Sequence, residues 1–342
     1  MPLHRLNQIT VAVPDVAATG AYYTDFGLSA APGDTGTPAG TGGTGTPDGT
    51  AASGGAAPPL AEPTTGAATY ATADGGAQLV LVPGHRRRLL EIRVGADDPD
   101  DIDAIAFRLA RLDIPATRVP GGIRAQDPGT EAAVVVEVTA RVTQRATPTP
   151  PYNAPGDAPR LDSRAPGVLR ETPVRPRKLG HVVVGSTDQE GSQRFFTEGL
   201  GFRTSDTVPG LAAFMRCSTD HHNVLVQQAP IAFLHHTAWE VDDVDEVGRG
   251  ASAMLEGHPE RHVWGLGRHH IGSNFFWYLR DPAGNFSEYY SDLDCIVDEA
   301  LWKPETLEGM RGLYNWGPPP PPSFLAPDDL ADLMTGSHGA GA

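Results

Sequence analysis

The sequence predicts an α+β protein made of two copies of one module, each a curved mixed sheet with helices outside and a cavity inside. Residues 178–188 align with residues 5–15 without a gap, and later residues 234–241 match residues 87–94, each followed by a predicted helix. Self-similarity of this kind indicates a repeated structural unit. Each copy contains two βαβ-like pieces with extra strands, so the predicted architecture is a tandem of paired βαβββ units.

Hydrophobic patterning places the elements of the first copy. Runs rich in apolar and β-branched residues predict strands over residues 6–13, 68–72, 78–82, 89–94 and 132–142. A short helix is predicted over residues 15–25, and a second over residues 100–112, where apolar residues approximate helical spacing. Between them, residues 31–66 consist largely of Gly, Thr, Pro and Ala, which cannot bury enough apolar surface to fold. We interpret this segment as a disordered insertion.

In the second copy, the last predicted element is a β-hairpin. Residues 275–280 form an aromatic, strand-like run, residues 281–285 contain the Pro, Gly and Asn typical of a tight turn, and residues 286–290 return as a second strand. Glu288 therefore lies in the middle of a strand among bulky aromatic residues. A buried ionised carboxylate needs a cation or a metal as its partner.

The same patterns divide the chain into four parts. Residues 1–143 are predicted to form the N-terminal module and residues 178–300 the C-terminal module. Residues 144–177, which are rich in Pro and Arg and show no periodicity, form the predicted linker. Residues 301–342 form a Pro-rich tail, which either covers the mouth of a site or is an exposed linker.

Composition narrows the possible partners and location. The formal net charge is −16 and the sequence pI is about 5.1, which disfavours a nucleic-acid partner. We find no signal-peptide-like apolar core and no run of membrane-spanning length, and we expect a cytoplasmic protein with no membrane partner. The two cysteines, Cys217 and Cys295, are too few for a disulfide framework and are expected to be reduced thiols.

Three residues of the second copy form a candidate metal site. His181 and His236 stand near the starts of two predicted strands and Glu288 on the last, whereas the overlay places Gln8 and Leu89 opposite the two histidines. Two imidazoles and one carboxylate on one face leave open coordination positions, an arrangement that suits non-haem Fe(II). The alternative is that both histidines are ordinary strand residues.

The acidic run at residues 242–246 is expected to begin a helix.

With these motifs in place, the second copy resembles the catalytic domain of the two-domain extradiol, catechol-type dioxygenases of the vicinal oxygen chelate superfamily. That family combines a metal-free first module with a metal-bearing second one, and its last hairpin has an Asp-Pro-Ser-Gly-like turn before the Glu. The corresponding turn here is Asp-Pro-Ala-Gly at residues 281–284. The resemblance implies tandem vicinal oxygen chelate modules with His181, His236 and Glu288 as metal ligands.

The resemblance also implies three further site residues. His222 is the implied acid or base, while His269 and Tyr278 would bind and orient the substrate oxygens. His269 lies nine residues before Tyr278, which lies ten before Glu288, and both spacings agree with the family pattern. The stretch from His222 to the second ligand is one residue shorter than in the family, so His221 is a competing assignment for the acid or base.

The implied function is cleavage of a catechol by an Fe(II)-dependent extradiol dioxygenase that inserts both atoms of O2, with Mn(II) as a second possible metal. The family further implies a homo-oligomer. Two alternatives share the scaffold, because a fold does not fix a function: a glyoxalase-like metal-dependent lyase or isomerase, and a protein that binds aromatic ligands. The sequence leaves open which catechol is cleaved and on which side of a substituent.

Strand alternation and loop position predict lesser roles for the neighbouring residues. His235 and His270 are expected to point away from the site. Residues 258–264, which include His262 and Trp264, are expected to form a loop before the hairpin.

Overall fold

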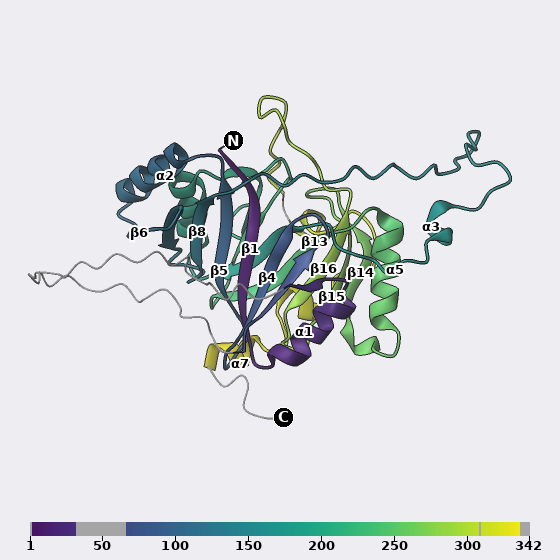
Figure 1. Ribbon diagram of the computed structural model, residues 1–342, viewed down its shortest axis with the longest axis horizontal. Helices are drawn as coiled ribbons and strands as arrows, with labels where there is room; N and C mark the ends of the chain where they lie inside the picture. The colour runs from purple at the N-terminus through teal and green to yellow at the C-terminus, as the bar shows by residue number, and fades with distance from the viewer. Residues whose placement is uncertain (1, 32–65, 308, 336–342) are drawn as a thin grey trace, which may run out of the picture.

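A computed structural model describes residues 2–31, 66–307 and 309–335, and contains two eight-stranded sheets (Figure 1). The strands of the first sheet are β1 (Leu3–Val13), β2 (Ser29–Ala31), β3 (Ala68–Thr72), β4 (Gly76–Pro83), β5 (Arg88–Ala96), β6 (Ala116–Val119), β7 (Gly122–Gln126) and β8 (Ala133–Val138). Those of the second are β9 (Leu179–Ser186), β10 (Arg203–Val208), β11 (Ala212–Arg216), β12 (Val224–Gln228), β13 (Phe233–Glu240), β14 (His262–Arg268), β15 (Phe275–Arg280) and β16 (Phe286–Ser291).

The strand order is the same in both sheets. The first has the order β2-β3-β4-β1-β5-β8-β7-β6, and the second has the order β10-β11-β12-β9-β13-β16-β15-β14. Adding eight to each strand number of the first sheet gives the second. Both sheets are mixed, because β1 pairs with β4 and β5 with β8 in parallel, as do their counterparts in the second sheet. The predicted α+β fold with tandem modules is confirmed.

The helices that belong to the two modules repeat as well, and each of these α-helices begins at an aspartate. They are α1 (Val16–Asp25) and α2 (Pro99–Arg111) in the first half, and α4 (Gln189–Arg194), which continues as the π-helical turn η1 (Phe195–Leu200), and α5 (Val244–Leu255) in the second. The side chain that accepts a backbone N–H at each start belongs to Asp15, Asp98, Asp188 and Asp243. Such N-caps satisfy amide groups that the helix leaves unpaired. No helix in the described part of the chain is long and apolar enough to cross a membrane.

The two halves pack through each other's helices. Phe26, at the end of α1, stacks on Tyr289 of β16 with ring centroids 3.8 Å apart, and the Tyr289 hydroxyl donates to the Phe26 carbonyl oxygen. Figure 1 shows α1 lying near β16, and the Tyr23 hydroxyl of α1 lies 3.2 Å from the Ser287 hydroxyl of β16. Arg108 of α2 in turn donates to the carbonyl oxygens of Gly199 and Leu200. One continuous hydrophobic core therefore joins both modules.

Several predicted boundaries differ from the structure. The short strands β2, β6 and β7 were missed because Gly, Ala and charged residues weaken the strand pattern in them. The run at residues 132–142 ends as a strand at Val138. The expected loop at residues 258–264 is wrong from His262 onward, because β14 begins there and pairs with β15. The predicted insertion at residues 31–66 lies outside the described residues except for its two end positions.

The segment that follows residue 300 folds back onto the protein. It contains η3 (Gly309–Gly312), α6 (Pro322–Leu325) and α7 (Leu330–Thr335). Asp329 accepts two hydrogen bonds from the buried guanidinium of Arg87, at 2.6 and 2.9 Å, and Asp328 pairs with Arg280. Of the two interpretations of the tail, the structure therefore excludes the exposed linker for this part. The linker at residues 144–177 contains one short helix, α3 (Pro166–Leu169).

The buried carboxyl of Asp281, in the turn of the last hairpin, should make the free energy of unfolding depend on pH. Asp281 is buried and accepts the backbone N–H groups of Ala283 and Asn285, and burial raises its pKa to about 6. The unfolded carboxyl ionises near its usual value of about 3.9. We therefore expect the free energy of unfolding to fall as the pH rises from about 4 to about 6. Urea titrations across this range should show a shallower decline for Asp281→Asn, and an identical decline would contradict the assignment.

Candidate functional site

Three neighbouring strands bring the predicted metal ligands together. The strands β9, β13 and β16 are adjacent in the second sheet, and Ala238 of β13 lies opposite both His181 and Glu288 in the register. The ligand atoms of His181, His236 and Glu288 all lie within 4.8 Å of one another, and the three side chains are buried. The sequence thus identified three residues that the fold places at one point.

The donor atoms of this trio fit a divalent cation. Nε2 of His181 lies 3.1 Å, and Nε2 of His236 lies 3.6 Å, from Oε2 of Glu288. The His236 Nε2 atom is buried without a hydrogen-bond partner among the described residues. A buried polar atom left unpaired costs about 1–3 kcal/mol. Two imidazole nitrogens and a carboxylate oxygen are donors that iron and manganese accept.

The corresponding face of the first sheet has no such trio. Its register places Gln8, Glu91 and Val135 where the second sheet has its ligands. The sequence overlay of His236 on Leu89 is therefore wrong by two residues, since the register places Glu91 at the position that corresponds to His236. The sequence did not reveal this shift, because a shift of two residues preserves the alternation of side chains along a strand. Across the described ranges, the three residues of the second sheet are the one group of three or more His, Cys, Asp or Glu side chains placed closely enough to hold a metal ion.

His235 hydrogen-bonds the candidate ligand His236, contrary to the expectation that it points away from the site. The pairing of β13 with β9 skips His235 between Leu234 and His236, so a β-bulge breaks the alternation there. His235 Nε2 lies 2.6 Å from the Phe324 carbonyl oxygen, which can only accept, and burial lowers the pKa of His235 to about 4. Its Nδ1 then accepts from His236 Nδ1, 2.7 Å away. The His236 Nε2 lone pair is left for a metal.

His222 lies on the cavity wall beside the ligands, and His221 lies behind it. The ring of His222 is 4.1 Å from that of His181 between centroids, whereas His221 does not line the cavity. Burial, followed by the neighbouring imidazoles, lowers the pKa of His222 well below its ordinary value. A neutral imidazole therefore faces the site. The geometry favours His222 over His221 as the group in reach of a bound molecule.

The last hairpin supplies the remaining polar groups. Nδ1 of His269 donates to the carbonyl oxygen of Leu313, so its Nε2 accepts from the Tyr278 hydroxyl at 2.9 Å. Burial raises the pKa of Tyr278 well above its ordinary value, which keeps the phenol protonated. Asn274 donates to the second oxygen of Glu288 at 3.0 Å and so orients the carboxylate. Both residues expected to bind substrate oxygens, His269 and Tyr278, line the same cavity as His181 and His236.

The cavity is small and largely apolar. Its volume is about 70 Å³, and its apolar lining consists of Val183, Phe214, Leu225, Ile271, Leu313 and Phe324. Phe324 of α6 packs against Tyr278 and Phe286, with ring centroids 4.7 and 5.9 Å away. The folded-back C-terminal segment therefore forms part of the cavity wall and covers the site.

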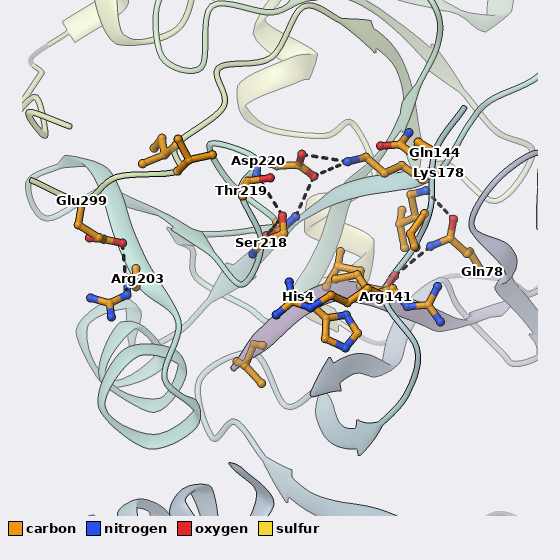
Figure 2. Close-up of a pocket in the computed structure, with 18 residues that line it drawn as sticks. His4, Gln78, Arg141, Gln144, Lys178, Arg203, Ser218, Thr219, Asp220 and Glu299 are labelled. Atoms are coloured by element: carbon orange, nitrogen blue, oxygen red, sulfur yellow. Dashed lines mark hydrogen bonds and ion pairs between the residues drawn. The ribbon is translucent and has the colours of Figure 1, made fainter. Parts of the chain in front are cut away.

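A second, larger cleft lies between the modules, away from the trio. Its volume is about 340 Å³, and Figure 2 shows its polar lining. Lys178 there is held by both oxygens of Asp220, and Arg203 pairs with Glu299 (Figure 2). Its size does not make it the candidate site, because it lacks the convergent imidazoles of the smaller cavity.

Three residues of the site were not predicted. Asn274 is an isolated amide just before β15 and has no spacing signature. Leu313 and Phe324 stand in a Pro-rich segment without periodicity, so nothing in the sequence places them over the metal ligands. Cys217 and Cys295 are both free, as expected, with Cys217 buried and Cys295 exposed.

Comparison with known proteins agrees with this geometry. Residues 178–289 match the model of the Glyoxalase/Bleomycin resistance protein/Dioxygenase superfamily, so this stretch is a domain of that superfamily. Metapyrocatechase 2 of Cupriavidus necator is 37% identical over 171 residues, which are 47% of this chain and 53% of the relative. The manganese-dependent 2,3-dihydroxybiphenyl 1,2-dioxygenase of Geobacillus genomosp. 3 is 29% identical over 42% of this chain and 50% of its own.

A third relative, the iron-dependent extradiol dioxygenase of Rhodococcus jostii (strain RHA1), is 28% identical over 36% of this chain and 45% of its own. The chain thus spans about half the length of the curated relatives it matches.

Solved structures extend the likeness in fold to nearly the whole chain. The Mn(II)-bound glyoxalase from Novosphingobium aromaticivorans has a TM-score of 0.66 and 24% identity, covering 94% of this chain and 93% of its own. Homoprotocatechuate 2,3-dioxygenase from Brevibacterium fuscum has a TM-score of 0.67 and 18% identity, covering 94% and 91%. At these identities the comparison establishes the shared two-module fold.

Proposed function

We propose that this protein is an extradiol dioxygenase that cleaves the ring of a catechol and inserts both atoms of O2. The observation that carries the proposal is the convergence of two sets of groups on one cavity. His181, His236 and Glu288 supply metal ligands, and His222 and Tyr278 stand on the same walls. The activities named for the curated relatives support it.

The division of the chain follows from this proposal. Residues 1–143 form the metal-free module, residues 144–177 the linker, residues 178–300 the catalytic module and residues 301–342 a tail, whose described part covers the site. The trio lies in the catalytic module, and the tail reaches it through Phe324.

Each residue of the site has a role in this proposal. An Fe(II) or Mn(II) ion held by His181, His236 and Glu288 supplies Lewis acidity and electron transfer to O2 when bound. His222 is neutral and accepts a proton from a catechol hydroxyl at its Nε2 atom, the ring nitrogen opposite the bond to His221. Tyr278 and His269 hydrogen-bond the substrate oxygens and orient the ring. The apolar walls exclude water.

The cavity favours a compact and uncharged catechol. None of the described residues that line it is a lysine or an arginine, so a carboxylate on the substrate would be left unpaired. The volume of about 70 Å³ and the aromatic ring of Phe324 leave little room for a second ring. The proposal is therefore for a one-ring catechol with small apolar substituents.

Removing the Phe324 ring should widen this preference. In Phe324→Ala we expect the ratio of kcat/KM for biphenyl-2,3-diol to that for catechol to rise about tenfold, because the pocket gains room for a second ring. Steady-state assays with both substrates measure the ratio. Leu325→Ala, at an exposed neighbour in the same helix, is the matched control and should leave the ratio unchanged. An unchanged ratio in Phe324→Ala would place the size limit elsewhere.

The function is tested by loading the protein anaerobically with Fe(II) or Mn(II), admitting air, and following yellow ring-cleavage product with a panel of catechols. Product from small neutral catechols, and little from carboxylated ones, is the expected outcome. Tight binding of zinc or nickel with no product from any catechol would overturn the proposal in favour of a lyase or isomerase.

A further inference from the structure

A line of three buried side chains leads away from the cavity behind His222. The Nδ1 atom of His222 lies 3.1 Å from Nδ1 of His221, and Nε2 of His221 lies 2.8 Å from Oδ2 of Asp206 in β10. All three residues are buried, with exposed fractions of 4% or less. The two imidazoles face each other through their Nδ1 atoms, so one Nδ1 must donate the hydrogen bond and the other must accept it. The hydrogen bonds along the three side chains therefore all run in one direction.

Asp206 sets that direction. Its Oδ1 accepts the backbone N–H of Glu305 at 2.6 Å, and its Oδ2 accepts Nε2–H of His221. When His221 carries one proton, that proton lies on the Nε2 that faces Asp206, so Nδ1 of His221 has a lone pair and accepts Nδ1–H of His222. The other nitrogen of His222, Nε2, is then unprotonated.

The surrounding side chains hold His221 in this orientation. The Trp302 ring lies 5.2 Å from that of His221 between centroids, at an interplanar angle of 69°, and its indole N–H donates to the Ser205 carbonyl oxygen. Phe214 packs on His221 from another direction. Trp302 and Glu305 both belong to the segment after residue 300, which thus holds this line in place as well as covering the cavity.

We propose that Asp206 and His221 are positioning residues that fix the ring orientation and the tautomer of His222, so that its Nε2 presents a lone pair to the substrate. The consequence for turnover rests on the proposed dioxygenase function. The hydrogen-bond assignment does not, because it follows from Asp206, His221 and Glu305 alone.

Replacing one carboxylate oxygen of Asp206 by an amide nitrogen should reverse the direction of the hydrogen bonds from residue 206 to His222. In Asp206→Asn the amide has one oxygen, and the Glu305 backbone N–H can only donate, so that oxygen stays with Glu305. The amide NH2 then faces Nε2 of His221, which must become the acceptor. His221 carries its proton on Nδ1 and donates to His222, whose proton moves to Nε2.

Nitrogen NMR of the full-length protein purified without iron tests this directly. The imidazole 15N shifts distinguish protonated from unprotonated ring nitrogens, and His222→Phe identifies the His222 signals by their loss. We expect the Nδ1–H tautomer at His222 in the wild type and the Nε2–H tautomer in Asp206→Asn. The same tautomer in both proteins, or Nε2–H in the wild type, would overturn the proposal whether or not the protein cleaves catechols.

A second variant keeps the test open if Asp206→Asn does not fold. His221→Phe keeps a ring against Phe214 and Trp302 but removes the acceptor that faces Nδ1 of His222. We expect a mixture of His222 tautomers, and a kcat lower by roughly 10- to 100-fold with little change in KM, as for supporting residues behind a reactive group. His258→Phe, at an exposed histidine paired with Glu260, is the matched control. A single unchanged tautomer of His222 in His221→Phe would contradict the positioning role.

Discussion

Glu288→Ala is expected to lose the bound metal and with it all measurable ring cleavage. The side chain is fully buried, supplies the carboxylate of the trio, and has no other carboxylate within the cluster to replace it. Without it, two imidazoles remain, and a divalent cation loses the negative charge that balances it. Metal analysis after anaerobic loading and gel filtration should show less than a tenth of the wild-type content, an order-of-magnitude expectation for a lost ligand.

The control for this variant is Glu260→Ala, which removes an exposed carboxylate that pairs with His258. It should keep both metal and turnover. Wild-type metal content in Glu288→Ala would refute the ligand assignment, and circular dichroism would show whether a loss of metal reflects misfolding instead.

His222→Phe is expected to separate metal binding from catalysis. Phenylalanine keeps a ring in contact with His181 and Phe214 but removes the nitrogen that accepts a proton. Loss of a general acid or base lowers rates by about 10²- to 10⁴-fold. The metal content should stay at the wild-type level while kcat falls by that factor.

His258→Phe, an exposed histidine changed in the same way, should leave both quantities unchanged. Full turnover in His222→Phe would remove His222 from the mechanism and return attention to His221.

The sequence predicted those parts of the site whose signal is local. Residues 275–280 and 286–290 correspond to β15 and β16, because aromatic strands around a Pro-Gly-Asn turn leave little freedom. The sequence pointed to the three candidate ligands because the repeat shows approximately which strand positions correspond, and the fold places these residues together. The overlay nevertheless slipped by two residues at His236, since a period of two does not define register.

What the sequence could not predict depends on long-range packing. The bulge at His235 is visible only in the pairing of β13 with β9, and it turns a residue expected to point away into the support of a ligand. Phe324 comes 36 residues after Glu288 in a segment without periodicity, yet it closes the cavity. Asp206 and His221 meet because β10 passes the loop before β12. None of these contacts has a local pattern.

The stoichiometry of the reaction is the most direct test of the proposed function, in which the protein inserts both atoms of O2 into the ring of a catechol. Iron-loaded protein is mixed with a small neutral catechol and a limiting amount of O2, while an oxygen electrode and product mass spectrometry follow the reaction. We predict one O2 consumed per catechol and a product heavier by both oxygen atoms. A product lighter by two hydrogen atoms, with hydrogen peroxide formed, would show oxidation to a quinone and contradict the account.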